Sequence, residues 1–186
     1  MDDIPIIEAS ISTRVLTPAD AEAYRSVRLC ALHERPPAFG SLPETKSNLA
    51  ETAVRLAESQ DCCFWGAFQG QQLLGSIRLS RYEAMNEKHR AYLAGLYVLP
   101  AFRCRGCGRA LVKQALHQAV RTPDLRRVNL TVVTQQVIAI QLYQSFGFHI
   151  YGTEQEAFFK GDQFYDEHLM TLSLNAYGIG KRELPD

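Results

Sequence analysis

The chain has 186 residues, of which 46% are hydrophobic and 22% are charged, the balance of a soluble globular protein. Twenty Lys and Arg residues match twenty Asp and Glu residues, so the net charge gives no sign of a nucleic-acid partner. No apolar run approaches the roughly 18 residues of a membrane span, and the acidic N-terminus does not resemble a signal peptide. We therefore expect a cytoplasmic protein with no membrane contact. It should form a single domain over 1–186, with a leader at 1–10, a core at about 11–174 and a tail at 175–186.

Local signals predict the elements of the first half of the chain. Thr17-Pro18-Ala19-Asp20 is typical of a helix start, with a capping hydroxyl, an early proline and an acid in the first turn. Pro36-Pro37 stops that helix and opens a loop over 36–41. Gln69-Gly70-Gln71-Gln72 joins two apolar runs and predicts a hairpin. The predicted elements are a strand at 11–16, helices at 17–33 and 47–59, and strands at 62–68 and 73–80.

The second half alternates strands and helices after a polar loop at 81–90. Gly95 lies inside an apolar strand and predicts a bulge or a close backbone approach there. Gly147 fits the position that ends a helix, and Lys160-Gly161-Asp162-Gln163 predicts the turn of a closing hairpin. The predicted elements are strands at 91–98, 128–133, 150–159 and 164–174, and helices at 109–121 and 137–146.

An anion-binding turn is predicted after the strand at 91–98, in the pattern Arg103-x-x-Gly106-x-Gly108. The first N–H groups of the following helix lack intrahelical partners, and the helix dipole favours a phosphate at this end. Glycines without a Cβ let main-chain amides approach phosphate oxygens closely. Positive charge is added by three arginines: Arg103, Arg105 and Arg109. The turn is neither a Walker loop nor Gly-x-Gly-x-x-Gly.

The five cysteines do not form an obvious framework. An odd number without a secretion signal argues against disulfides. Cys104-x-x-Cys107 could be a redox or zinc motif, but zinc would need a second spaced pair, and Cys62-Cys63 are adjacent. We interpret the cysteines as incidental, although a thiol at a helix N-terminus has a lowered pKa and can be oxidised.

Two sequence blocks resemble those of the GCN5-related N-acetyltransferases, the GNAT family. Val98-Leu99-Pro100, followed by Arg103-x-x-Gly106-x-Gly108, is similar to the coenzyme A pyrophosphate loop of that family. The second block, Ala139-Ile140-x-Leu142-Tyr143-x-x-x-Gly147-Phe148, lies at the expected distance downstream. The resemblance implies the α/β acyl-CoA N-acyltransferase fold. This fold is a mixed six- to seven-stranded sheet with a splayed central parallel pair, flanked by about four helices.

The resemblance also implies acetyl-CoA as cosubstrate, an amine acceptor and no metal. The implied cofactor-binding residues are Leu96, Tyr97, Val98, Arg103, Cys104, Arg105, Gly106, Cys107, Gly108, Arg109 and Gln136. Many relatives carry asparagine where Gln136 stands, so its amide is shifted by one methylene. The tyrosine matching Tyr143 protonates the departing thiolate in relatives, which implies a catalytic role here. Alternatively, Tyr143 is a core aromatic residue on the predicted helix.

The general base is not identified by the sequence. Some relatives place a glutamate on the central strand, where this chain has Tyr92. Glu83, Glu87 and His89 lie just upstream and could act through water, or they could be solvated loop charges. A less basic acceptor amine would reduce the need for a base.

Three functions compete at this point. The first is an acetyl-CoA-dependent N-acetyltransferase that moves the acetyl group directly to a primary amine of a small molecule or peptide. The second is a catalytically silent acyl-CoA sensor, suggested by Tyr92 and Gln136 at family positions. The third is a redox protein that uses Cys104 and Cys107. A homodimer is possible through the final hairpin.

Overall fold

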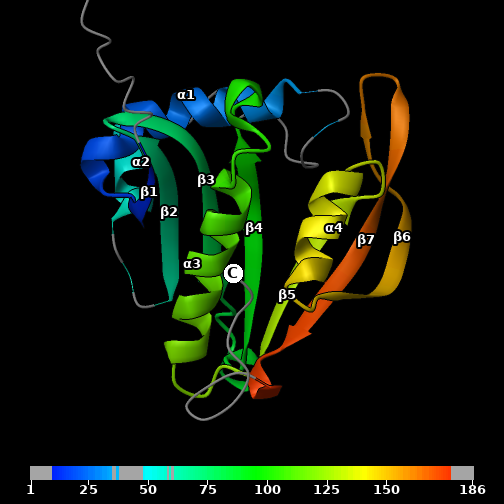
Figure 1. Cartoon of the computed structure of the whole chain (residues 1–186). Helices are drawn as coiled ribbons and strands as arrows, with labels where there is room; N and C mark the ends of the chain where they lie inside the picture. The colour runs from blue at the N-terminus through cyan, green and yellow to red at the C-terminus, as the bar shows by residue number, and fades with distance from the viewer. Residues whose placement is uncertain (1–9, 35–36, 38–47, 58, 60, 177–186) are drawn as a thin grey trace, which may run out of the picture.

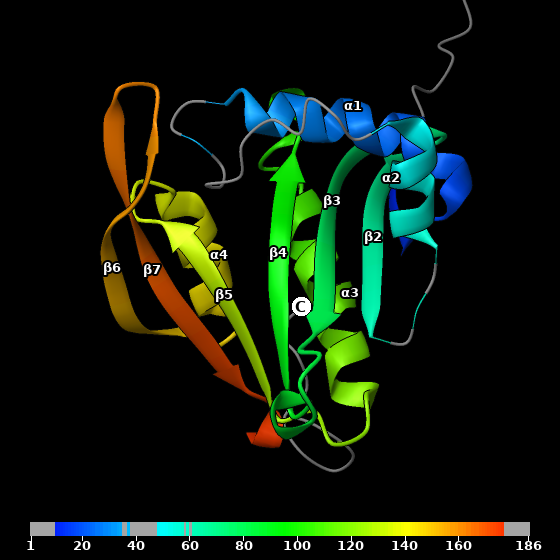
Figure 2. The same ribbon diagram turned by 180° about the vertical axis from the view of Figure 1, so that it is seen from behind.

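A seven-stranded sheet carries the other elements of the chain, in the strand order β1-β2-β3-β4-β5-β7-β6. The computed structural model describes residues 10–34, 37, 48–57, 59 and 61–176. Helices α1 and α2 lie on one face of the sheet, and α3 and α4 lie on the other (Figures 1 and 2). Each face has its own apolar core. The predicted α/β fold, with a mixed sheet and four helices, is confirmed.

The elements follow the predicted order. The strands are β1 Ile11–Val15, β2 Cys62–Gln69, β3 Gln72–Arg81, β4 Arg90–Val98, β5 Arg127–Val133, β6 His149–Lys160 and β7 Gln163–Ser173. The helices are α1 Ala21–Leu32, α2 Leu49–Leu56, α3 Cys107–Arg121 and α4 Val137–Ser145. Short 3-10 turns cover Pro18–Asp20, Met85–Glu87, Pro100–Phe102 and Leu174–Ala176. Most of the predicted leader, of the tail and of the 36–41 loop lies outside the described residues.

The local signals for turns and helix ends act as predicted. The amide and hydroxyl of Thr17 donate to the Asp20 carboxylate at 2.8 and 3.0 Å, which fixes the entry to α1. Gly70 and the pair Gly161 and Asp162 have positive φ angles in the two hairpin turns. Gly147, with φ of +90°, follows α4, and its N–H donates to the carbonyl of Gln144. These confirmed turns fix the lengths of the hairpins and of α4.

The centre of the sheet is where pairing fails. Strands β4 and β5 are parallel, but their pairing ends at Tyr92 opposite Asn129. Gly95 has φ of +64° and forms the predicted bulge, because Ile77 of β3 faces two residues of β4 there. The splayed parallel pair implied by the family resemblance is therefore present, and the two strands begin to separate before the bulge. Figure 2 shows β5 leaning away from β4 toward β7.

One glycine lets β3 pack against the end of β4. A Cβ placed on Gly75 would lie 2.4 Å from the carbonyl oxygen of Tyr97 and 3.0 Å from Cα of Val98. Both of these atoms belong to the main chain, so they cannot move aside like the end of a side chain. Gly75 therefore allows β3 to lie close to the C-terminal end of β4, beside the separated strands.

We expect Gly75→Ala to lower the free energy of unfolding by about 1–3 kcal/mol, because the added methyl overpacks a main-chain contact. Urea unfolding followed by circular dichroism measures the loss. Gly152→Ala is the matched control, since its Cβ would meet only the flexible Leu169 side chain, at 3.3 Å. Equal stabilities for the two variants would contradict the prediction.

Candidate active site

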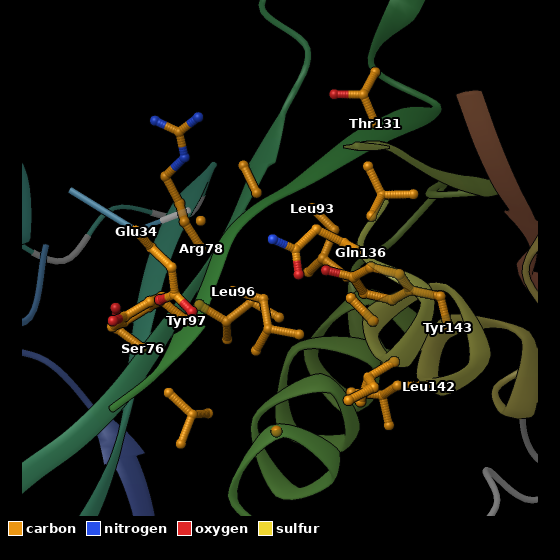
Figure 3. A pocket seen from close by; sticks show the side chains of 18 of the residues that line it. Glu34, Ser76, Arg78, Leu93, Leu96, Tyr97, Thr131, Gln136, Leu142 and Tyr143 are labelled. Carbon is orange, nitrogen blue, oxygen red and sulfur yellow. The ribbon is translucent and has the colours of Figure 1, made fainter. Parts of the chain in front are cut away.

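A cavity of about 870 Å³ lies where β4 and β5 separate, a volume typical of small-molecule sites (Figure 3). Its walls come from α1, α2, β2 to β7, α3 and α4. Ten of the twelve predicted site residues line it: Leu96, Tyr97, Val98, Arg103, Cys104, Gly106, Gly108, Arg109, Gln136 and Tyr143. Arg105 and Cys107 are not among the lining residues. Strand separation thus brings together side chains from two distant sequence blocks.

The N-terminus of α3 forms one end of the cavity. The helix begins at Cys107, two residues earlier than predicted, and Gly106 precedes it with φ of +84°. The first intrahelical bond runs from the Ala110 N–H to the Gly106 carbonyl, at 2.9 Å. The N–H groups of 106–109 therefore have no partner within the helix, and a Cβ on Gly106 would meet no atom within 4 Å. This open cradle of donors suits a phosphate group.

The three arginines of the turn have different surroundings. Arg103 forms a bidentate ion pair with Glu34, at 2.6 Å for both contacts, and its Nε donates to the Val98 carbonyl at 3.0 Å. Arg109 donates to the Ser145 hydroxyl at 3.0 Å and lies over the Phe146 ring. Arg105 lies over the Phe102 ring, outside the cavity wall. The positive charge expected around the turn is thus partly neutralised at Arg103.

Glu34 is a site residue that the sequence did not reveal. It follows α1, lines the cavity and joins α1 to the end of β4 through Arg103. Burial raises the pKa of the Glu34 carboxyl, but hydrogen bonds from Arg103 and Tyr97 outweigh burial and hold the pKa below its usual value. Burial and the nearby Glu34 carboxylate raise the pKa of Tyr97 to about 12. Glu34 is therefore a structural anion at neutral pH.

Tyr143 is buried on α4, and in Figure 3 its hydroxyl end points away from that helix toward β4. Burial, aided by Tyr92, raises the pKa of its phenol above 10, so the group keeps its proton at neutral pH. Its ring packs edge-on against Phe148. No described residue forms a hydrogen bond with the Tyr143 hydroxyl. The geometry allows this phenol to donate a proton into the cavity.

Gln136 precedes α4, and its amide nitrogen donates to the Pro37 carbonyl at 3.1 Å. The side chain lines the cavity, as predicted, and its amide also bonds to the main chain of Pro37. A contact between this amide and a cofactor stays a prediction.

Comparisons with known proteins identify the family. The sequence model of the Acetyltransferase (GNAT) family matches residues 27–148, well over half of the chain. This chain belongs to the GNAT family. It is an acetyl-CoA-dependent N-acetyltransferase.

Individual relatives agree with this family and fold. The chain is 24% identical over 112 residues to a spermine/spermidine N(1)-acetyltransferase of Bacillus subtilis, covering 57% of this chain and 74% of that protein. A GNAT acetyltransferase of Streptococcus pneumoniae superposes with a TM-score of 0.80 at 23% identity, over 88% of this chain and 99% of that one. The putative acetyltransferase yncA of Salmonella typhimurium, determined with acetyl-CoA, has a TM-score of 0.77 at 19% identity. That superposition covers 95% of this chain and 98% of the other.

This GNAT protein does not place the predicted base candidates in its cavity. Glu83, Glu87 and His89 precede β4, at the end where β4 and β5 are still paired, and none lines the cavity. Glu87 forms an ion pair with Arg90. The structure brings other polar groups into the opening instead, namely Tyr92, Thr131 and Glu167. No local motif marks these residues, because strand pairing alone makes them neighbours.

The two cysteines of the Cys104-x-x-Cys107 pattern lie in different environments in this GNAT protein. Cys104 is exposed, whereas Cys107 is buried and its thiol lies 3.5 Å from the Phe102 carbonyl. Burial raises the pKa of the Cys107 thiol, so the lowered value expected at a helix N-terminus is wrong for this residue. The described residues contain no group of three or more potential metal ligands. None of their helices is long and apolar enough to cross a membrane.

We expect Glu34→Gln to lower the free energy of unfolding by roughly 0.5–1 kcal/mol at pH 7, because a partly exposed ion pair with Arg103 is lost. The folded-state pKa of Glu34 lies below its unfolded value near 4.5. Its stabilisation is therefore present above pH 4.5 and is lost as the pH falls through the folded-state pKa.

Urea unfolding at a series of pH values from 7 to 3.5 tests this pH dependence. The difference between wild type and Glu34→Gln should shrink as the carboxyl becomes protonated. Glu22→Gln, an exposed change on α1, is the control for the loss of a carboxylate outside the cavity. A difference for Glu34→Gln that stays constant with pH would show that the ion pair is not its cause.

Proposed function

We propose that this protein transfers the acetyl group of acetyl-CoA directly to a primary amine, with Tyr143 as the proton donor to the departing thiolate. The supporting observation is the opening between β4 and β5. This opening joins the N–H groups at the start of α3, which precede the first intrahelical bond, to the Tyr143 hydroxyl within one cavity. The acceptor is a small molecule or a peptide amine.

The main chain of the protein supplies the cofactor contacts in this proposal. The N–H groups of 106–109 bind the pyrophosphate, helped by the helix dipole. Beyond Tyr92, the edge of β4 that faces β5 has no strand partner. That edge can hydrogen-bond to the pantetheine arm as it would to an added strand. Leu96, Tyr97 and Val98 lie on this part of β4 and line the cavity.

The chemistry requires one base and one acid. An alkyl ammonium with a pKa near 10.4 costs about 4.6 kcal/mol to deprotonate at pH 7, so the acceptor benefits from a base. Once neutral, its nitrogen lone pair forms the new N–C bond, and an N–H of β4 stabilises the developing oxyanion. As the C–S bond breaks, sulfur takes the electron pair, and Tyr143 protonates it.

A direct route fits the position of the cysteines. Cys104 lies in the turn that would face the phosphates, and the Cys107 thiol faces the interior. Neither thiol is placed to form an acyl-enzyme with a thioester held along β4. Replacing both cysteines by serine should leave the transfer intact.

The amine character of the acceptor is supported by one relative. The Bacillus subtilis protein is named as an acetyltransferase of spermine and spermidine. Isothermal titration with acetyl-CoA, followed by thiol release with a panel of amines, tests the proposal. Absence of binding at millimolar acetyl-CoA would overturn it, and binding without thiol release for any amine would indicate a binding protein.

We expect Tyr143→Phe to lower kcat by about 10²-fold or more, because the leaving thiolate loses its general acid. The dissociation constant for acetyl-CoA should be unchanged, since the ring and its packing against Phe148 are kept. Thiol release gives kcat, and isothermal titration gives the dissociation constant.

Tyr151→Phe is the matched control, because Tyr151 is 58% exposed on β6 and does not line the cavity. A Tyr143→Phe protein that keeps the kcat of this control would show that Tyr143 is only a core aromatic residue.

A further inference from the structure

One wall of the cavity carries a group of polar side chains that the sequence motifs do not include. Tyr92 lies on β4 at the last pair before the strands separate, opposite Asn129 of β5. Thr131 lies two residues further along β5, and Glu167 of β7 pairs with Val133 in the neighbouring register. All three residues line the cavity, and Figure 3 shows Thr131 across the view from Arg78 of β3.

These three side chains lie on the sheet face opposite α3 and α4. Side chains alternate along a strand, and Ala91 and Leu93 of β4 pack in the core beneath α3 and α4. The same alternation places Leu130 and Val132 of β5 in that core and turns Thr131 to the other face. The group therefore borders the cavity from the side of α1 and α2, away from the helix N-terminus that would bind the pyrophosphate.

Two members of the group share a hydrogen bond, and the third is a carboxylate. The Tyr92 hydroxyl lies 2.8 Å from the Thr131 hydroxyl. The Thr131 hydroxyl also faces Glu167 and lowers the pKa of its carboxyl. Glu167 is half-buried, and no Lys, Arg or His of the described residues forms an ion pair with it. A half-buried carboxylate without a counter-charge is costly, and a bound cation would relieve that cost.

Glu34, the other acidic residue among the described cavity-lining residues, already has a partner. Among the described lining residues, the carboxylates are Glu34 and Glu167. Glu34 is held in a bidentate ion pair with Arg103. Arginines also line the walls contributed by α1, α2 and β3, at Arg28, Arg55 and Arg78. An ammonium group entering the cavity is therefore attracted to the β7 side, where Glu167 lies.

We propose that Glu167 binds the ammonium group of the acceptor and takes its proton before transfer. This inference rests on the proposed function. The N–H bond of the ammonium breaks, the proton goes to a carboxylate oxygen of Glu167, and the freed lone pair attacks the thioester carbonyl. Family members with a glutamate on the central strand carry the carboxylate where Tyr92 stands here. In this chain, β7 supplies it across the strand opening.

The charged neighbours of Glu167 support this role. Burial raises the pKa of its carboxyl, the nearby Thr131 hydroxyl lowers it, and the nearby Glu154 of β6 raises it, with a net increase. Tyr92 of β4 lies near the Glu167 carboxyl, and Arg78 of β3 lines the same cavity. His168, the next residue on β7, bonds instead to Thr153 of β6. A carboxylate with a raised pKa is a stronger base than an exposed one.

The test compares Glu167→Gln with wild type and with the control Glu156→Gln. Glu156 is exposed on the same hairpin and does not line the cavity. The assays are isothermal titration with acetyl-CoA and thiol release across pH 6–10, with the amine that the wild type acetylates fastest. We expect Glu167→Gln to keep the wild-type dissociation constant, which shows that the fold and the cofactor site are intact. Its kcat/KM should fall by about 10²-fold or more at pH 7.

The pH dependence separates a base from a positioning residue. The deficit of Glu167→Gln should shrink as the pH rises, because the acceptor then arrives already neutral. A Glu167→Gln protein that matches Glu156→Gln at pH 7 would overturn the proposal, and so would a deficit that stays the same at every pH. A wild-type protein that releases no thiol with any amine would instead refute the proposed function, and this inference with it.

Discussion

The structure depends on the loss of main-chain pairing between β4 and β5 beyond Tyr92. Each strand is held firmly on its outer side, β4 by β3 and β5 by all seven of its residues against β7. The inner edges can therefore separate without unfolding the sheet. Main-chain donors and acceptors left along such an edge favour a ligand that can bond to them. The cavity, its lining residues and the exposed start of α3 all follow from this separation.

The charges of the cavity are arranged along this opening. Main-chain N–H groups and Arg109 lie at the α3 end, where a diphosphate would bind. Arg103 is committed to Glu34, so its main effect in the structure is to hold α1 against the end of β4. Glu167 of β7 and Arg78 of β3 line the cavity from either side of the opening between β4 and β5. The protein thus offers separate regions for an anionic cofactor and for a cationic acceptor.

The features that the sequence predicted are those with local causes. The Thr17 helix start, the Gly95 bulge, the end of α4 at Gly147 and the hairpin turns each depend on a few consecutive residues. The two motif blocks likewise predicted ten residues that line the cavity. Glu34 and Glu167 could not be predicted, because their roles depend on pairings distant in sequence: Arg103 with Glu34, and β7 with β5. The raised thiol pKa of Cys107 also depends on tertiary burial, which local helix-end reasoning does not include.

The most direct test of this account is the affinity for acetyl-CoA of Gly106→Ala, compared with that of Gly70→Ala. Both glycines have positive φ angles, and a Cβ placed on either of them would meet no atom within 4 Å, so each change strains the backbone without a steric clash. Gly106 begins the proposed phosphate cradle, whereas Gly70 lies in a hairpin turn outside the cavity. Isothermal titration should show affinity at least about tenfold weaker for Gly106→Ala alone, equivalent to about 1.4 kcal/mol. Equal affinities for the two variants would contradict the claim that the start of α3 and the strand opening form one coenzyme site.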